Sequence, residues 1–356
     1  MSTRWETADV LKAPMEICWQ FAYEIDSDKL HTLYAKAKQY QWDAEADLDW
    51  SIEVDPSRPI MEDDVIGGVM RVPLVQRLSA AERSTLLAHL SAHRLSQFLH
   101  GEQGALMTAA ALTHAVPDYQ GKLYAATQTM DEARHVEVYA RYIKKLAIIY
   151  PMGAALKRII DLTLTANHWV KIAIGMNMIV EGLALASFHN MLRVTPCELL
   201  RSILRGVLRD ESRHVAFGAL YVGDAVAAMH PDDREDIADF TFDIVSLMRR
   251  ARHNTTPDAG FLSVLDHSGI DRQDFVRSVA QHRASGERVE LPHDQVHPFK
   301  HLMMPALVRV GAITERVRER YSAEGIPIWE DRAMLEAFER NQSVEMATSG
   351  AETEPV

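Results

Sequence analysis

The sequence predicts an all-α protein, built on a four-helix bundle with additional helices at both ends. Two observations indicate this fold class. Helix-start signals are followed by long runs of apolar residues at helical spacing, and strand-like alternation is scarce. No linker separates two apolar cores. We therefore expect a single domain over residues 1–341, with the bundle core at about 79–229, and a disordered polar tail at 342–356.

Capping signals mark where the bundle helices begin. Ser79–Glu82 has the spacing of a capping box, and the helical periodicity that follows it lasts until Pro117. Asp118 can cap the next helix, and a second capping box, Thr195–Glu198, precedes the last bundle helix. The predicted helices cover residues 79–115, 118–146, 152–164, 167–194, 196–229, 230–253 and 309–321. The glycine- and proline-bearing segment 55–73 is expected to be a loop, and residues 254–301 show no clear period.

The composition excludes several classes of protein. The 356 residues are 47% hydrophobic and 25% charged, which is typical of a globular chain and not of a disordered one. The net charge of −12 disfavours a general nucleic-acid binder, because phosphate contacts need a positive surface. The two cysteines, Cys18 and Cys197, are too few for a disulfide scaffold or a four-cysteine iron–sulfur cluster. A reduced, cytoplasmic setting is expected.

Targeting and cofactor motifs are also missing. Residues 1–12 do not have the pattern of a signal peptide. The most apolar stretch, 172–188, carries Asn177 and Glu181 and is short for a membrane span, so we expect a buried helix. Neither a P-loop nor a GxGxxG dinucleotide motif is present. Any redox chemistry therefore needs a separate electron donor, such as a reductase or a ferredoxin.

A pattern of acids and histidines recurs on the four bundle helices. A lone glutamate on one helix is followed 30 residues later by Glu-x-x-His on the next, and the same arrangement is repeated with the same spacing. Residues three apart share one face of a helix, so each Glu-x-x-His pair can reach a single point. The six residues are Glu102, Glu132, His135, Glu181, Glu211 and His214.

Helical spacing places these acids on faces that are mostly apolar. The stripe around Glu132 is more mixed, because Gln128 and Thr129 belong to it, so the burial of Glu132 is the least certain. A buried, unpaired carboxylate costs several kcal/mol or takes up a proton, so gathered acids need a shared cationic partner. Four carboxylates and two imidazoles suit iron or manganese, which predicts a site for two metal ions.

Chance is the alternative explanation for a single pair. About one Glu-x-x-His is expected by chance in a chain with 16 histidines, and a third one occurs at Glu290–His293. We discard it because Pro292 breaks the helix that it needs. Two pairs with matched preceding glutamates favour a metal site over two surface pairs.

These residues carry a family resemblance. The chain resembles the ferritin-like superfamily of diiron-carboxylate proteins over about 79–229. The two Asp-Glu-x-Arg-His motifs are most similar to those of the hydroxylase α subunits of bacterial multicomponent monooxygenases. The p-aminobenzoate N-oxygenases and the ribonucleotide reductase small subunits are similar but more distant. The resemblance implies that Glu102, Glu132 and His135 hold one metal. It assigns the other metal to Glu181, Glu211 and His214, with some carboxylates bridging.

The resemblance also implies roles for the motif residues beside the ligands. Asp131 and Asp210 would accept the free N–H of a ligand histidine, expected to be the one on the opposite helix. Arg134 and Arg213 would neutralise these two acids. A plain surface ion pair is the alternative for the arginines.

The chain departs from the related families at several positions. The hydroxylase α subunits carry a threonine where this chain has Leu185, and the N-oxygenases carry a further histidine where it has Val207. The ether cross-link of the ligand-binding oxidases is not expected, because the matching positions are Ala105 and Met176. The reductase small subunits carry a redox tyrosine that corresponds to Tyr139. Tyr139 is therefore a candidate catalytic residue, the alternatives being a hydrogen-bond partner and a half-buried helical tyrosine.

We expect an O2-dependent oxidase or monooxygenase with two iron ions per chain (Fe/Fe), or with one manganese and one iron (Mn/Fe). Its substrate would be a small, mainly apolar organic molecule. The small residues Ala105, Ala109 and Ala110 leave room for it beside the cluster. A tyrosyl-radical subunit and a metal-storage protein are the alternatives. The relatives suggest a homodimer, and neither a nucleic-acid nor a membrane partner is expected.

Overall fold

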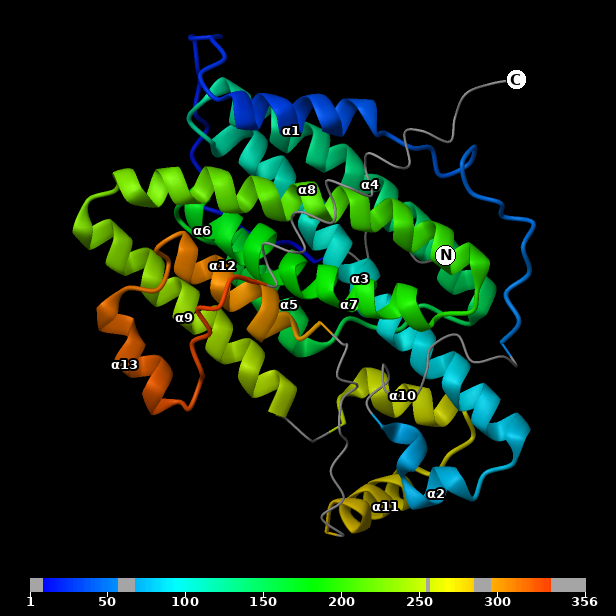
Figure 1. Ribbon diagram of the computed structural model, residues 1–356. Helices are drawn as coiled ribbons and strands as arrows, with labels where there is room; N and C mark the ends of the chain where they lie inside the picture. The colour runs from blue at the N-terminus through cyan, green and yellow to red at the C-terminus, as the bar shows by residue number, and fades with distance from the viewer. Residues whose placement is uncertain (1–8, 57–67, 254–256, 285–295, 334–356) are drawn as a thin grey trace.

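The computed structural model describes residues 9–56, 68–253, 257–284 and 296–333, which form helices and no strand (Figure 1). The predicted all-α class is confirmed. The longer elements are α1 (Asp28–Gln39), α3 (Ala80–Ala115), α4 (Tyr119–Leu146), α5 (Ala154–Leu164), α7 (Glu181–Val194), α8 (Glu198–Ala228), α9 (Pro231–His253) and α11 (Arg272–Ala284). The shorter ones are η2 (Val69–Arg71), α2 (Pro73–Gln76), α6 (Trp169–Ala173), η3 (Ile174–Val180), α10 (Ala259–His267), η4 (Pro298–Met303), α12 (Met304–Arg309) and α13 (Glu315–Ala323).

The bundle consists of α3, α4, the continuous run α6–η3–α7, and α8. Helix α3 packs along α4, and α7 packs along α8. Helix α1 lies over α4 and α8, and α2, α10 and α11 gather beyond one end of α3 (Figure 1). Two predicted caps are confirmed: the Ser79 side chain accepts the Glu82 N–H within a capping box, and Asp118 accepts the Gly121 N–H.

Two large apolar clusters fill the bundle, one on each side of a polar layer. Along α3, Leu95 belongs to one cluster and Leu112 to the other, with Glu102 between them. Along α4 the order reverses, because this helix runs the other way, with Tyr124 before Glu132 and Val138 after it. The polar layer therefore lies midway along the bundle, where water is excluded from both ends.

The second predicted capping box is wrong. Helix α8 begins at Glu198, and its N-cap residue, Cys197, makes no side-chain capping bond. Thr195 instead ends α7, since its backbone N–H donates to the Met191 carbonyl. Its hydroxyl accepts the Cys197 N–H at 3.4 Å. Thr195 therefore lies in the turn between α7 and α8, because its backbone N–H already makes the last hydrogen bond of α7.

The predicted helix at 309–321 is wrong in where it starts, although its second half is confirmed as α13. Helix α12 ends at Arg309, and α13 begins at Glu315. Gly311, with φ of 76°, lies between them in the left-handed region that only glycine adopts easily. Helices α1, α2, α10 and α11 were not predicted. Glu290–His293 and the tail at 342–356 lie outside the described residues.

The third bundle helix changes its hydrogen-bond register just before Glu181. Residues Ile174–Val180 form a π-helix, in which each N–H bonds to the carbonyl five residues earlier. The Glu181 N–H accordingly donates to the Met176 carbonyl. Short π segments inside α-helices often occur at functional sites.

The whole run from Trp169 to Val194 is long and apolar enough to cross a membrane. However, 78% of its most apolar window is buried inside the protein, as expected of a core helix.

Replacement of Gly175 by alanine tests whether the π segment depends on close helix packing. The new Cβ would lie 2.5 Å from Thr163 Oγ1, a hydroxyl held by the Ile159 carbonyl. We expect Gly175→Ala to destabilise the protein by about 1–3 kcal/mol through overpacking. Gly182→Ala is the control, because that Cβ meets nothing within 4 Å and alanine favours the helix by about 0.5–1 kcal/mol. Urea unfolding measures both, and equal effects would contradict the packing argument.

Candidate metal centre

The structure brings all six predicted ligand residues together in the polar layer. Helix α3 supplies Glu102, α4 supplies Glu132 and His135, α7 begins with Glu181, and α8 supplies Glu211 and His214. None of the six residues is more than 4% exposed. Glu132, whose burial was the least certain, is 0% exposed.

One group of side chains surrounds His135. Its Nδ1 atom lies 3.3 Å from a carboxylate oxygen of Glu102, of Glu132 and of Glu211. One ligand atom from each of these four residues lies within 4.8 Å of all the others. A single cation can therefore reach four donors at this position.

A second group surrounds His214 and shares Glu132 with the first. Glu132, Glu181 and His214 each place a ligand atom within 4.8 Å of the other two. His214 Nδ1 lies 3.0 Å from Glu132 Oε1 and 3.7 Å from Glu211 Oε2. The sequence grouped Glu211 with His214, whereas in the structure Glu211 lies near both histidines. Glu132 and Glu211 thus occupy the positions suited to bridging carboxylates.

Atoms that have no hydrogen-bond partner test whether the cluster fits metal ions. Glu132 Oε2, Glu211 Oε2 and His214 Nδ1 are buried and make no hydrogen bond. Although His214 Nδ1 is close to a Glu132 oxygen, the contact does not have hydrogen-bond geometry. Buried polar atoms are normally satisfied, so these unpaired donor atoms, which belong to residues of the two groups above, indicate a site for cations. Hard oxygen donors with imidazole suit iron or manganese.

The pKa shifts of the cluster residues also indicate a site for cations. Burial, followed by the charge of Glu211, raises the pKa of Glu102 and of Glu181 well above its usual range. Burial opposes ionisation of Glu132 too, but the two histidines outweigh it and lower its pKa. Carboxylate partners likewise overcome burial and raise the pKa of His135 and His214. Protons therefore balance this charge when no metal is bound, and metal ions would displace them.

The second nitrogen of each histidine faces an aspartate on the opposite helix. His135 Nε2 lies 3.2 Å from Asp210 Oδ2, and His214 Nε2 lies 3.3 Å from Asp131 Oδ2. An Nε2–H that donates to a carboxylate leaves Nδ1 as the lone-pair atom. This is the tautomer in which Nδ1 can bind a metal.

Two arginines lie behind the aspartates and are not surface ion pairs. Arg134 and Arg213 are 4% and 1% exposed, so the surface alternative is wrong. Arg134 Nη2 donates to Asp210 at 2.9 Å and to Asp131 at 2.5 Å. Arg213 Nη2 donates to Asp131 at 3.3 Å and also to Asp210. Each aspartate therefore contacts both guanidinium groups.

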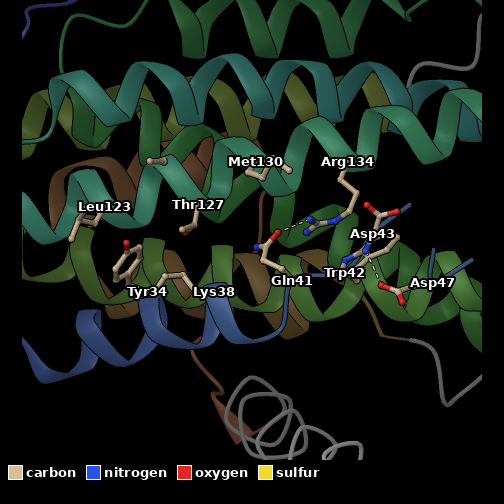
Figure 2. A pocket seen from close by; sticks show the side chains of 11 residues that line it. Tyr34, Lys38, Gln41, Trp42, Asp43, Asp47, Leu123, Thr127, Met130 and Arg134 are labelled. Atoms are coloured by element: carbon tan, nitrogen blue, oxygen red, sulfur yellow. Dashed lines mark hydrogen bonds between the residues drawn. The ribbon is translucent and has the colours of Figure 1, made fainter. Parts of the chain in front are cut away.

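Two residues beyond the end of α1 complete this network and were not found from the sequence. Trp42 Nε1 donates to Asp210 Oδ2 at 2.7 Å, and Gln41 Nε2 donates to Asp131 Oδ1 at 2.8 Å. Gln41 also accepts a hydrogen bond from Arg134, as Figure 2 shows. Gly206 permits the approach of the tryptophan, because a Cβ there would lie 2.8 Å from the indole ring. No motif links this segment to the bundle, so the sequence offered no signal for it.

Glu181 has its own partners, which were also missed as functional residues. Gln128 Nε2 donates to its Oε1 atom at 2.7 Å, and Asn177 Nδ2 donates to its Oε2 atom at 3.2 Å. Asn177 Nδ2 also donates to the side-chain Oε1 atom of Gln128 at 2.9 Å. Two amides thus fix the orientation of Glu181, and one of them, Gln128, is a polar residue that made the Glu132 stripe look mixed.

Tyr139 is fully buried, rather than half-buried as one alternative had it. Its ring stacks on Phe188 at 5.8 Å and lies 6.5 Å from Phe98. Its hydroxyl has no hydrogen-bond partner among the described residues, so the hydrogen-bonding role is not observed. Burial raises the pKa of Tyr139 well above its usual value. Its redox role stays a prediction.

A cavity of about 220 Å³ opens beside three of the carboxylates, those of Glu102, Glu181 and Glu211. Its other lining residues are Gln97, Phe98, Gly101, Ala105, Leu156, Met176, Val180, Leu183, Ala184, Ser187 and Met248. Of the three alanines expected to leave room, only Ala105 lines it. Ala109 is buried but does not line the cavity, and Ala110 is exposed.

A larger cavity of about 690 Å³ lies outside the bundle, between α1 and α4 (Figure 2). Gln41, Trp42 and Arg134 line it, but none of the six ligand candidates does.

Replacement of Trp42 by phenylalanine tests whether the indole supports the metal site. The change removes the hydrogen bond to Asp210 and loosens the carboxylate that orients His135. We expect metal affinity to fall about 10–100-fold, as is typical when an outer hydrogen-bond partner is lost. Trp50→Phe is the matched control, because Trp50 Nε1 donates only to the Ala44 carbonyl. Competition with a metal-binding dye measures both, and equal loss in the two variants would contradict the role of Trp42.

Comparisons with known proteins identify the family of the chain. No curated protein matches the chain. An R2-like ligand-binding oxidase with an aerobically reconstituted Mn/Fe cofactor aligns with a TM-score of 0.49 and 18% identity. That alignment covers 82% of this chain and 94% of the oxidase. A mutant of such an oxidase with an anaerobically reconstituted Mn/Fe cofactor aligns with a TM-score of 0.48 and 19% identity, over 80% and 93%.

The family model described as P-aminobenzoate N-oxygenase AurF matches residues 25–290. The match covers about three quarters of the chain and includes all six ligand candidates. This family is one of the three that the motifs resemble, and its members are O2-dependent dimetal oxidoreductases of the ferritin-like superfamily. The chain belongs to the p-aminobenzoate N-oxygenase AurF family.

Proposed function

We propose that this dimetal-carboxylate oxygenase holds its two metal ions with Glu102, Glu132, His135, Glu181, Glu211 and His214, and that it oxidises a small organic molecule bound in the adjoining cavity. The observation that carries the proposal is the set of buried, unpaired donor atoms that face one another in the bundle. Iron in both positions, or manganese with iron, suits these donors. Family membership favours this function over a storage protein or a radical-generating subunit.

The bound ions would supply the electrons that reduce O2 and the positive charge that stabilises reduced oxygen. The chain holds the reacting groups in place around them. Asp210 and Asp131 keep each histidine in one tautomer, and Gln128 with Asn177 keeps Glu181 in one orientation. The apolar walls of the cavity keep water from the reacting atoms.

The substrate is expected to be small. The name of the family refers to p-aminobenzoate, a single-ring aromatic amine. A cavity of 150 Å³ lined by apolar residues is known to hold benzene, so about 220 Å³ suits a monocyclic molecule. Oxidation at a nitrogen or at a carbon of such a ring is consistent with the cavity.

The remaining proposals concern the setting of the enzyme. Electrons would come from a separate reductase or ferredoxin, because the sequence has neither a nucleotide-binding motif nor cysteines for a cluster. A cytoplasmic location is supported by the two cysteines, which are both free in the structure.

Metal analysis of a double variant tests the centre. Glu132→Ala/Glu211→Ala removes both carboxylates that lie near the two histidines. We expect about two iron or manganese ions per chain in the wild type and close to none in the variant, by mass spectrometry of the purified proteins. Glu137→Ala is the control, because Glu137 lies on α4 but is exposed. Little metal in the wild type, even after anaerobic loading with iron, would refute the assignment.

We further propose that the protein is a homodimer and that its N-terminal arm, residues 17–25, lies in the interface. Every second residue of this extended arm is a large apolar one and is at least half exposed. These residues are Ile17, Trp19, Phe21, Tyr23 and Ile25. An exposed apolar patch of this kind is typical of an interaction surface. A buried aromatic side chain covers about 150–250 Å², so five large side chains approach the roughly 800 Å² per partner of a standard interface.

Trp19→Ser/Phe21→Ser tests the arm. The two rings stack on each other at 6.0 Å, and their loss should weaken association. We expect a dimer for the wild type and a monomer for the variant in sedimentation velocity. Met130→Ser, which removes an exposed apolar side chain from α4, should leave the dimer intact. A monomeric wild type would contradict the proposal, as would an unchanged dimer in the arm variant.

A further inference from the structure

One glycine of α3 is not required by the packing around it. Gly101 lies inside this helix, where glycine is less favourable than alanine because it loses more backbone freedom on folding. Close packing explains Gly104 on the same helix, since a Cβ there would lie 2.6 Å from Ile160 Cδ1. A Cβ at Gly101 would meet nothing within 4 Å. Neighbouring side chains therefore do not account for a glycine at position 101.

The space beside Gly101 adjoins the cavity at the metal centre. Gly101 lines this cavity together with Phe98 and Ala105, which lie three residues before it and four residues after it on the same face of α3. Glu102, the next residue in the chain, also lines the cavity. Because a Cβ at Gly101 meets no other group, a side chain there would extend into the cavity, close to a proposed ligand of the metal ions.

We propose that Gly101 is a specificity-determining residue, whose missing side chain leaves the width that a substituted ring needs beside the metal ions. The inference deepens the proposed function and rests on it, because it takes the cavity as the substrate site. A helix backbone without a side chain presents a flat surface, against which a planar ring can lie. Leu183 and Ala184 line the same cavity from α7, so the ring would lie between residues of two helices. The glycine makes α3 less stable but leaves room for the ring.

A side chain at position 101 would fill a calculable part of the cavity. An apolar cavity of 150 Å³ holds benzene, so one carbon atom needs roughly 25 Å³. The three carbon atoms of a valine side chain would therefore fill roughly 75 Å³, about a third of the 220 Å³ that the cavity offers. In a helix valine is held in one strongly preferred rotamer, so its two methyl groups stay fixed beside the backbone.

Gly101→Val tests the proposal with two probes of different size, p-aminobenzoate and aniline. Calorimetric titration of the Mn(II)-loaded protein in the absence of O2 measures binding without turnover. We expect the affinity for p-aminobenzoate to fall about tenfold or more. The affinity for aniline should fall several times less, because the smaller molecule needs less of the lost volume. Gly101→Ala, which adds one carbon atom, should give affinities between those of the wild type and Gly101→Val.

Gln103→Val is the matched control. It places the same side chain on α3, but Gln103 is exposed and does not line the cavity. We expect this variant to bind both probes as the wild type does. Because valine is more favourable than glycine in a helix, Gly101→Val should melt no lower than the wild type and should keep its metal. A lower melting temperature together with an equal loss of both probes would indicate a packing role and overturn the inference.

The results separate this inference from the proposed function. Unchanged binding of p-aminobenzoate by Gly101→Val, or an equal loss of both probes, would overturn the role of Gly101 alone. A wild type that retains metal but binds neither probe would refute the assignment of the cavity to the substrate, and the inference with it. A wild type that does not retain metal would refute the dimetal centre itself.

Discussion

The structure depends on balancing negative charge that is buried in the middle of a helical bundle. Four glutamates and two aspartates lie in the polar layer, each at most 4% exposed. The two buried arginines offset two of their six charges. Two divalent cations would offset the remaining four, and the histidines could then stay neutral as ligands. Ionised groups are tolerated in a core only when they are paired and hydrogen-bonded, which explains why each of the four bundle elements contributes to this layer.

The partners of this charge form two shells with different origins. The inner donors come from α3, α4, α7 and α8. The outer shell brings in Gln41 and Trp42, which α1 places against Asp131 and Asp210. Because Gly206 leaves room for the indole, a backbone position on α8 decides whether α1 can seal the bundle there. The outer shell therefore ties an element outside the bundle to the orientation of its histidines.

The sequence predicted the bundle helices and the six ligand candidates, since both depend on local rules. Caps at Ser79 and Asp118 and the three-residue spacing of Glu-x-x-His act within one helix. It did not predict Trp42 or Gln41, whose contacts lie more than 80 residues away in the chain. The capping box at Thr195 failed because two helices compete for one residue. The start of the helix at 309–321 failed because Gly311 adopts a left-handed conformation that the apolar period does not reveal.

The π segment gives the cavity wall a property that side-chain identity alone does not provide. Residues five apart share a face where backbone bonds run from i to i−5, so Met176 lines the cavity beside Glu181. Asn177, four residues before Glu181, also contacts it in the observed register. With ordinary α-helical bonding, Met178, three residues before Glu181, would share this face in place of Met176. The hydrogen-bond register of the backbone thus decides which side chains form the cavity wall. Deletion of one residue from Ile174–Val180 would rotate this part of the helix and bring different side chains to the cavity. The side chains that neighbouring helices contribute would stay the same. Evolution could therefore reshape the chamber by a change in chain length rather than by substitution.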